Sequence, residues 1–230
     1  MKIVILCGGL GTRLREHTEF IPKPMVPIGG VPVVEHIMRH YRHHFPKAEF
    51  ILCTGYKGEV IAKHFAGRER IHIIDTGQTT MTGARLSMVE VLLHETFALT
   101  YGDGLSDVDL TAELKYHKKS GCDATVCAVR EPSRFGQLVI RKGRVMSFHE
   151  KPAGGGERIN GGYFFMEPRV LHAVSADPSC VLEKDALPAI AKMGELAAYP
   201  HDGFWQPMDT YRDWLDLENK WATGKAPWKH

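Results

Sequence analysis

The stretch MKIVILCGGLGTRL (residues 1–14) decides the fold. It opens with a short, continuous apolar run over residues 2–7, which is typical of a central parallel strand buried on both faces. The run passes directly into a turn that contains Gly8, Gly9 and Gly11. Ligands of open parallel sheets bind outside the carboxyl ends of the strands, so this turn stands where a ligand site is expected.

The chemistry of this turn suits an anion. Glycine lets backbone N–H groups approach phosphate oxygens with no Cβ in the way, and Arg13 adds a cation capable of a bidentate contact. The turn is not the dinucleotide-binding fingerprint, because Leu14 stands in place of the third glycine, and no Gly-Lys-Ser/Thr follows as in a P-loop. The turn alone leaves a structural role and a phosphate-binding role equally open.

Lys23 favours the phosphate-binding interpretation. Pro22 and Pro24 fix the backbone on both sides of it. A lysine held this rigidly is better explained as a positioned ammonium for a phosphate than as a solvated charge, although a rigid surface loop with an incidental lysine is the alternative.

Periodicity along the rest of the chain predicts an α/β protein. Apolar runs predict strands, and apolar residues at helical spacing predict helices. In the first half, strands are expected at 2–7, 49–54, 70–75 and 96–101, and helices at 32–44, 57–66 and 83–93. After about residue 122, strands are expected at 123–130, 135–141, 144–149 and 160–166, the second and third as a hairpin, and helices at 183–193 and 210–222. Alternating strands and helices imply a Rossmann-like, mixed but mostly parallel sheet flanked by helices.

Composition excludes several classes of protein. The formal net charge of +2 gives no support for a nucleic-acid or membrane surface, and no apolar run approaches a membrane span. The five cysteines lack paired spacing, which indicates reduced, mostly buried thiols and a cytoplasmic location. Histidines at 36, 40, 43 and 44 have partial i,i+4 spacing, but interleaved arginines favour a solvated, partly packed helix face over a metal site.

Several blocks of sequence resemble one enzyme family. GGLGTRL (8–14) and PKPMVPIGGVP (22–32) resemble the signature of the sugar-1-phosphate nucleotidylyltransferases. Further blocks follow in order: DTGQTTMTGARL (75–86), TYGDGLSDVDL (100–110), FHEKP (148–152), INGGYFF (159–165), FWQPMDTYRD (204–213) and GKAPWK (224–229). Together they resemble the glucose-1-phosphate cytidylyltransferases more than the thymidylyl or uridylyl enzymes, and the likeness covers nearly the whole chain.

The resemblance implies a fold and a reaction. The fold would be the GT-A-like nucleotidyltransferase fold with a small β-hairpin sugar-binding subdomain. Residues 1–230 would form a single domain: a nucleotide-binding half (about 1–122), a sugar-phosphate-binding half (about 123–210), and a C-terminal helix and tail (about 211–230). The partners would be CTP and glucose 1-phosphate, giving CDP-glucose and pyrophosphate, in a homo-oligomer that binds neither nucleic acid nor membrane.

The resemblance also implies the site residues. Arg13, Lys23, Asp103 and Asp209 would be catalytic. Nucleotide binding would use Leu6, Gly8, Gly9, Gly11, Thr12, Arg13, Lys23, Thr80, Arg85 and Gly102. The sugar phosphate would be bound by Glu150, Lys151, Asn160, Gly161 and Gly162.

Two aspartates are candidates for a metal site. Asp103 follows a strand, and Asp209 precedes a predicted helix that it or Thr210 would cap. Mg²⁺ commonly takes one or two carboxylates and fills its other positions with phosphate oxygens and water. Spacing alone leaves a turn residue and a helix cap equally open, whereas the resemblance assigns both aspartates to Mg²⁺.

One departure from the family pattern leaves alternatives open. Relatives often carry a longer stretch between the second helix and the DTG block, whereas here only AGRERIHII (66–74) separates them. Relatives use that stretch for contacts between subunits and around the substrate. Its absence therefore leaves the oligomeric state and the identity of the sugar open. Three alternatives stay open. The first is UTP, dTTP or GTP in place of CTP, the second is another phosphorylated acceptor, and the third is an inactive regulatory subunit that senses sugar nucleotides.

Overall fold

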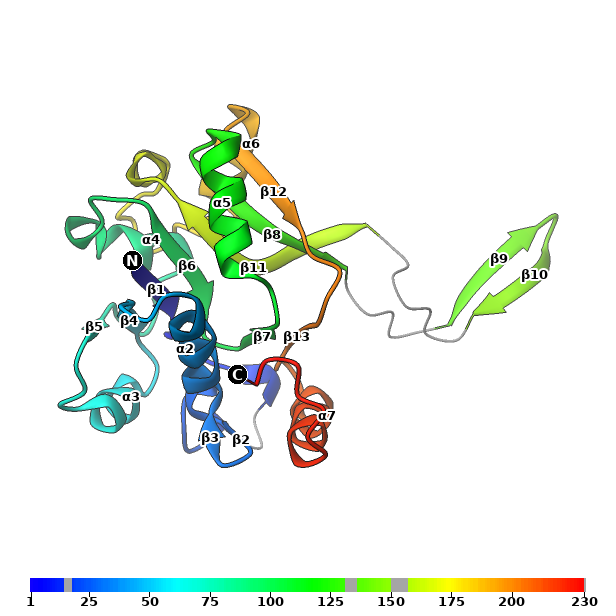
Figure 1. The fold of residues 1–230 in the computed structure, drawn as a ribbon, viewed down its shortest axis with the longest axis horizontal. Helices are drawn as coiled ribbons and strands as arrows, with labels where there is room; N and C mark the ends of the chain where they lie inside the picture. Colours follow the sequence, from blue (N-terminus) through cyan, green and yellow to red (C-terminus); the bar gives the residue numbers. More distant parts are fainter. Residues whose placement is uncertain (15–17, 131–135, 150–156, 230) are drawn as a thin grey trace.

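The computed structural model describes residues 1–14, 18–130, 136–149 and 157–229. Its centre is a seven-stranded sheet with the strand order β12-β8-β11-β6-β1-β4-β5 (Figure 1). In chain order the strands are β1 (Lys2–Leu6), β4 (Glu49–Thr54), β5 (Ile71–Asp75), β6 (Phe97–Tyr101), β8 (Ala124–Arg130), β11 (Arg158–Met166) and β12 (Leu196–Pro200). Strands from both halves of the chain therefore share one sheet.

The directions of these strands confirm the predicted mixed, mostly parallel sheet. Strands β6, β1, β4 and β5 run parallel to one another, and β12 runs parallel to β8. Only β11 is antiparallel, to β6 on one side and β8 on the other. The carboxyl ends of β1 and β6 consequently lie side by side at one edge of the sheet.

Helices cover both faces of the sheet, because the central strands bury alternate side chains on opposite faces. Ile3 and Ile5 of β1 pack in one core and Val4 and Leu6 in another. The first core is closed by α2 (Val33–His44), α3 (Gly58–Phe65), α5 (Leu110–Ser120) and α7 (Tyr211–Ala222). The second is closed by α4 (Thr82–Ser87), a π-helical turn η5 (Leu182–Ala186) and α6 (Leu187–Lys192).

Two predicted helices are shorter than expected. The helix expected at 83–93 ends as α4 at Ser87 and is followed by a 3₁₀ turn, η3 (Glu90–Leu92). The backbone tightens where the amide of Val89 donates to the carbonyl of Leu86, and this turn brings Val89 and Leu93 into the same core as Leu86. The helix expected at 183–193 is divided between η5 and α6.

Helix α5 was not predicted from the sequence. Asp109 caps it by accepting from the amide of Ala112, and Gly121 follows in the left-handed conformation. Its inner face carries Glu113 and His117, both buried, so the apolar stripe that signals a helix is interrupted. The short strands were missed as well: β2 (Pro27–Ile28), β3 (Val31–Pro32), β7 (Gly104–Ser106), β13 (Trp205–Pro207) and the sheet-edge strand β12.

The predicted solvated, partly packed histidine face on α2 is confirmed, and the structure shows which of its histidines are packed. His36 and His40 are buried, whereas His43 is exposed. The Nε2 atom of His36 lies 2.9 Å from the carbonyl oxygen of Ile28, and its ring meets Trp221 edge-on. The C-terminal helix and tail cover this face of α2, which the local pattern does not reveal.

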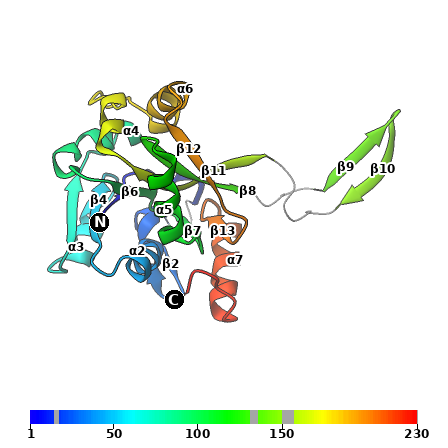
Figure 2. The same cartoon turned by 45° about the horizontal axis from the view of Figure 1, so that its top comes forward.

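The predicted β-hairpin forms a separate two-stranded sheet of β9 (Gln137–Arg141) and β10 (Arg144–His149). Figures 1 and 2 show it standing away from the main sheet. Its exposed apolar side chains are Leu138, Val139, Ile140, Val145, Met146 and Phe148.

All five cysteines are free and four of them are buried, which confirms the predicted unpaired, mostly buried thiols. Among the helices of the described ranges, none has the length and apolar character needed to cross a membrane.

Candidate active site

A cleft of about 800 Å³ opens at the carboxyl ends of β1 and β6. The residues predicted to be catalytic or nucleotide-binding all line it: Leu6, Gly8, Gly9, Gly11, Thr12, Arg13, Lys23, Thr80, Arg85, Gly102, Asp103 and Asp209. The sheet thus brings together segments from the beginning, the middle and the end of the chain.

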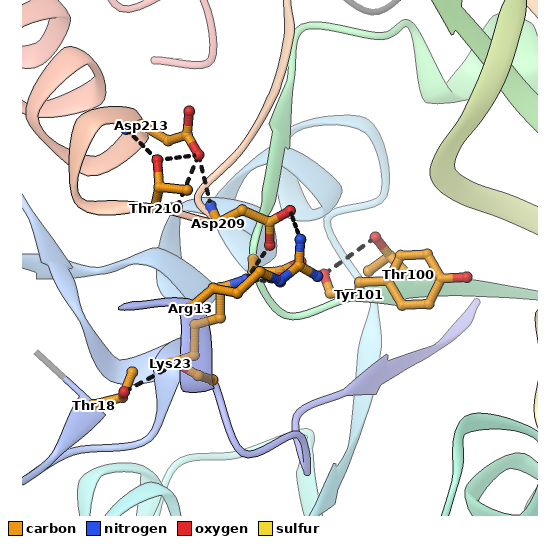
Figure 3. Close-up of polar contacts among 10 residues, drawn as sticks. Arg13, Thr18, Lys23, Thr100, Tyr101, Asp209, Thr210 and Asp213 are labelled. Carbon is orange, nitrogen blue, oxygen red and sulfur yellow. Dashed lines mark hydrogen bonds and ion pairs between the residues drawn. The ribbon is translucent and has the colours of Figure 1, made fainter. Parts of the chain in front are cut away.

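Two cations and two carboxylates converge in this cleft. The ammonium of Lys23 lies 2.6 Å from Asp103 Oδ2 and 2.6 Å from Asp209 Oδ1. The guanidinium of Arg13 lies 3.0 Å from the other oxygen of Asp209. Figure 3 shows Arg13 and Lys23 both directed at Asp209. The four charged side chains therefore hold one another in place through ion pairs.

The two cations differ in exposure. The side chain of Lys23 is 12% exposed and that of Arg13 is 75% exposed. Burial by itself would lower the pKa of Lys23, but Asp103 and Asp209 outweigh it and raise that pKa above its ordinary value. Lys23 is therefore a fixed positive charge at the floor of the cleft, whereas Arg13 stands at its mouth.

The backbone fixes Lys23 as its flanking prolines predict. Lys23 opens a 3₁₀ turn, η2 (Lys23–Met25), preceded by Pro22 in an extended conformation. Pro24 and Met25 are buried, so the turn is anchored in the core. Only the side chain of the lysine has freedom to change partner.

Pairing between two short strands brings Asp103 and Asp209 together. Strand β7 follows Asp103, β13 precedes Asp209, and Gly104 pairs with Pro207 in the antiparallel register. The amide of Met208 donates to the carbonyl of Asp103 at 2.9 Å. This pairing joins positions more than a hundred residues apart, which local patterns do not show.

Asp209 does not cap α7. Thr210 is the N-cap and forms a capping box with Asp213, whose Oδ2 also accepts from the amide of Asp209 at 3.2 Å (Figure 3). The capping role that was weighed for Asp209 therefore falls to Thr210. The carboxylate of Asp209 is directed at Lys23 and Arg13 instead.

Arg85 lies beneath the glycine turn and is 3% exposed. Its Nη1 donates to the carbonyl of Thr54 at 2.8 Å and to Thr76 Oγ1, and its Nη2 donates to the carbonyl of Gly8 at 3.1 Å. The expectation from the resemblance was a contact with the nucleotide. That contact stays a prediction; in this structure the guanidinium holds the turn to β4 and the segment after β5.

The predicted sugar-binding segment lies behind two aromatic walls of the cleft. Asn160, Gly161 and Gly162 do not line the cleft themselves, but Trp205 Nε1 donates to the carbonyl of Gly161 at 2.6 Å. Gly162 has a φ of 77°, and a Cβ placed on it would lie 2.5 Å from the ring of Tyr101. Glu150 and Lys151, predicted to bind the sugar phosphate, lie outside the described residues.

Several cleft residues were not among the predicted ones. They are Cys7, Leu10, Pro24, Gln78, Thr79, Met81, Thr82, Tyr101, Trp205 and Pro207. Most belong to the quoted sequence blocks, so their position in those blocks was the available signal. Trp205 forms part of the cleft wall.

The two carboxylates fit a divalent cation. One oxygen from each aspartate already lies 2.6 Å from a single positive atom, the Nζ of Lys23, so both oxygens converge on one point. Within the described part of the chain, no group of three or more histidine, cysteine or acidic side chains is arranged to hold a metal. The remaining positions of a hard cation at the aspartates would belong to substrate oxygens and water, as Mg²⁺ favours.

Comparisons with known proteins agree with this geometry. Residues 2–223 match the family model described as nucleotidyl transferase. The chain is 46% identical to a glucose-1-phosphate cytidylyltransferase of Salmonella typhimurium, with 100% of this chain and 99% of that protein aligned. It is 39% identical, with the same coverage, to a Bacillus subtilis protein described as a probable glucose-1-phosphate cytidylyltransferase.

The fold comparison points the same way. The crystal structure of HddC from Yersinia pseudotuberculosis superposes with a TM-score of 0.75 over 96% of this chain and 99% of that one, at 24% identity. At that identity the likeness concerns the fold. The resemblance stated from the sequence blocks is confirmed by the full-length identities.

Proposed function

The chain belongs to the nucleotidyl transferase family, and on that premise we propose that it transfers the cytidylyl group of CTP to glucose 1-phosphate. The products would be CDP-glucose and pyrophosphate. The observation that carries this proposal is the convergence of Arg13, Lys23, Asp103 and Asp209 beside a glycine turn at the end of the first strand. The full-length identity to cytidylyltransferases supports the choice of CTP and glucose 1-phosphate.

The proposed reaction needs alignment and neutralisation more than proton transfer. The attacking group is a phosphate oxygen that is already anionic at neutral pH, so no general base is required. Two polyanions must be brought together at one phosphorus, and positioning with electrostatic stabilisation supplies most of the catalysis.

The residues of the cleft would have different roles in this reaction. The backbone of residues 8–11 would hold the triphosphate, and Arg13 at the mouth would neutralise the departing pyrophosphate. Lys23 would exchange its carboxylate partners for phosphate oxygens near the reacting centre. We propose Mg²⁺ as the ion at Asp103 and Asp209, where it would neutralise charge on the reacting phosphates.

The sugar phosphate would enter from the side of β11. Asn160, Gly161 and Gly162 support the walls formed by Tyr101 and Trp205, and we assign the sugar subsite to this side of the cleft. Lys151 and Glu150 stay predicted partners of the sugar phosphate. None of the described residues of the β9–β10 hairpin lines the cleft, so its role in sugar binding also stays a prediction.

One experiment tests the proposed function. The purified protein is incubated with Mg²⁺ and each of CTP, UTP, dTTP and GTP against a panel of sugar 1-phosphates, and pyrophosphate release is measured. We expect the highest rate with CTP and glucose 1-phosphate. A higher rate with another pair would reassign the substrates, and no release with any pair would support the regulatory-subunit alternative.

The proposed homo-oligomer is tested separately. The alignment to the Salmonella protein spans 256 positions, whereas this chain has 230 residues. Light scattering, measured as the protein elutes from a size-exclusion column, gives its mass in solution. A mass of one chain at micromolar concentration would contradict the homo-oligomer without affecting the proposed reaction.

A further inference from the structure

Glu183 lies behind the cleft and binds two of its wall residues at once. It belongs to η5 and is not among the residues that line the cleft. Its Oε1 accepts a hydrogen bond from the hydroxyl of Tyr101, and its Oε2 accepts from Thr82 Oγ1 at 2.7 Å. One carboxylate therefore joins two cleft walls that are separate in the sequence.

The two partners of Glu183 belong to different parts of the site. Thr82 begins α4, directly after residues 78–81 of the cleft, in the segment predicted to contact the nucleotide. Tyr101 ends β6 immediately before Gly102 and Asp103. The carboxylate of Glu183 therefore spans the nucleotide wall and the wall next to the metal-site aspartate.

The nucleotide wall is docked on the segment that carries Glu183. The amide of Leu182 donates to Thr82 Oγ1 at 2.9 Å, and the amide of Met81 donates to the carbonyl of Pro178 at 2.8 Å. The amide of Gly83 donates to the carbonyl of Cys180 at 3.0 Å. The hydroxyl of Thr82 thus accepts one hydrogen bond and donates another, and Glu183 fixes the direction of its proton.

The wall formed by Tyr101 is held on two sides. The ring lies where a Cβ on Gly162 would stand, and the amide of Asn160 lies 3.4 Å from the hydroxyl oxygen. Burial, followed by the negative charge of Glu183, raises the pKa of Tyr101, so its hydroxyl keeps its proton and donates. Fixing that proton on Glu183 leaves the lone pairs of the oxygen toward Asn160, on the proposed sugar side.

We propose that Glu183 is a positioning residue that sets the distance between the nucleotide wall and the sugar wall of the cleft. It acts through Thr82 on one side and through Tyr101 on the other. This role rests on the proposed function, because it concerns the alignment of the two substrates. It does not depend on which base or sugar is used.

The test is a set of matched variants. Glu183→Leu removes both acceptors at similar size, Glu183→Gln keeps one acceptor oxygen, and Thr82→Val and Tyr101→Phe each remove one hydroxyl. Misplacing substrates by about 1 Å costs on the order of 100-fold, so we expect Glu183→Leu to lower kcat about 10- to 100-fold. We expect Glu183→Gln to fall between it and the wild type.

The single-arm variants, Tyr101→Phe and Thr82→Val, each remove one of the two hydroxyl groups that bind Glu183. Their effects on KM distinguish a positioning role from a role in folding. We expect Tyr101→Phe to raise KM for glucose 1-phosphate and Thr82→Val to raise KM for CTP, each with the other KM within about twofold. In the Glu183→Leu background, neither change should add to the loss in kcat/KM, because the link it breaks is already absent. Melting temperatures of all variants are measured alongside.

Several outcomes would overturn the proposal. They are wild-type kcat and KM values in Glu183→Leu, full additivity of the double variants, or equal changes of both KM values in each single-arm variant. If Glu183→Leu does not fold, Glu183→Gln replaces it in the same double variants. If the wild type turns over another substrate pair, the variants are compared with that pair, so the proposed substrates and the role of Glu183 fail separately.

Discussion

The guanidinium of Arg85 fills the space that a side chain on Gly8 would need. A Cβ on Gly8 would lie 2.0 Å from Arg85 Nη1, far inside any permitted contact. Because the same guanidinium donates to the carbonyl of Gly8, the turn above it is supported from below by a buried cation. The glycine is therefore required for the packing of Arg85. The absence of a side chain at this position also lets a ligand approach the backbone of the turn.

Gly8→Ala should weaken both the turn and the binding of nucleotide. Arg85 would have to leave its three acceptors or push the turn outward, and overpacking of this kind costs about 1–3 kcal/mol. We expect a lower melting temperature and at least a tenfold weaker binding of CTP by calorimetry. Gly9→Ala is the control for stability, because a Cβ there meets nothing within 4 Å. Equal melting temperatures for the two variants would contradict the packing argument.

Arg13→Ala should lower kcat/KM by about 10²- to 10⁴-fold, which is the loss expected when a partner of transition-state charge is removed. The fold should be unaffected, since this side chain is 75% exposed. Initial rates and the circular dichroism spectrum check the two statements. Arg39→Ala on α2 is the matched control, because Arg39 lies outside the cleft and is exposed. Near-normal turnover of Arg13→Ala would remove this residue from the proposed mechanism.

Asp209→Asn should raise the concentration of Mg²⁺ needed for half-maximal activity by at least tenfold. The amide retains the shape of the side chain but loses the charge that a hard cation requires. A magnesium titration of the initial rate measures the change. Asp216→Asn is the control, because Asp216 is on α7 but pairs with Lys220 outside the cleft. An unchanged titration would exclude Asp209 as a metal ligand.

Lys23→Met should tighten the binding of Mn²⁺ to the protein without nucleotide by about tenfold or more. The ammonium now neutralises Asp103 and Asp209 at 2.6 Å, so a divalent ion must displace it before both carboxylates are available. Electron paramagnetic resonance of free Mn²⁺ during a titration gives the affinity. The same variant should lose turnover, since the ammonium is also proposed to bind phosphate. Equal or weaker Mn²⁺ binding would show that the lysine does not compete with the ion.

Glu113→Gln should change how stability depends on pH. Neither carboxyl oxygen of the fully buried Glu113 has a hydrogen-bond partner in the described part of the protein, and burial raises its pKa well above the usual 4.5. Above about pH 4.5 the unfolded chain releases this proton while the folded protein retains it. The free energy of unfolding therefore falls as pH rises from that value.

Urea unfolding at pH 4 and pH 7 measures this effect. The stability of Glu113→Gln relative to the wild type should increase between the two pH values, because glutamine does not ionise. Exposed Glu90, changed to glutamine, serves as the control and should show no such increase. A constant difference between Glu113→Gln and wild type across this range would contradict a neutral buried carboxyl.

The sequence predicts the sheet well because its strands have a local signal. The apolar runs that became β1 and β4 are buried on both faces, and their predicted bounds differ from the observed ones by at most one residue. Glycines and prolines mark the strand ends and rigid turns that carry Arg13, Lys23 and Asp103, whereas their site roles were implied by the family resemblance. Such marks depend on neighbouring residues only, so they are readable without the fold.

The features that the sequence did not predict depend on contacts between distant segments, which no local pattern reveals. Helix α5 was missed because Glu113 and His117 occupy its buried face. Arg85 follows a local pattern that is typical of an exposed helix charge, yet its acceptors come from the glycine turn, β4 and the segment after β5. Glu183 is separated from Tyr101 by 82 residues and from Thr82 by 101, so neither partner is visible from its own segment.

The order of synthesis adds a consequence to the position of Asp209. Arg13 precedes it by 196 residues and Lys23 by 186. A nascent chain can form β1, β4 and the glycine turn while it is still on the ribosome, but Lys23 then has only Asp103 as a carboxylate partner. The second aspartate of the cleft arrives only with β13 and the start of α7, so the four charged side chains cannot come together until that segment has been synthesised.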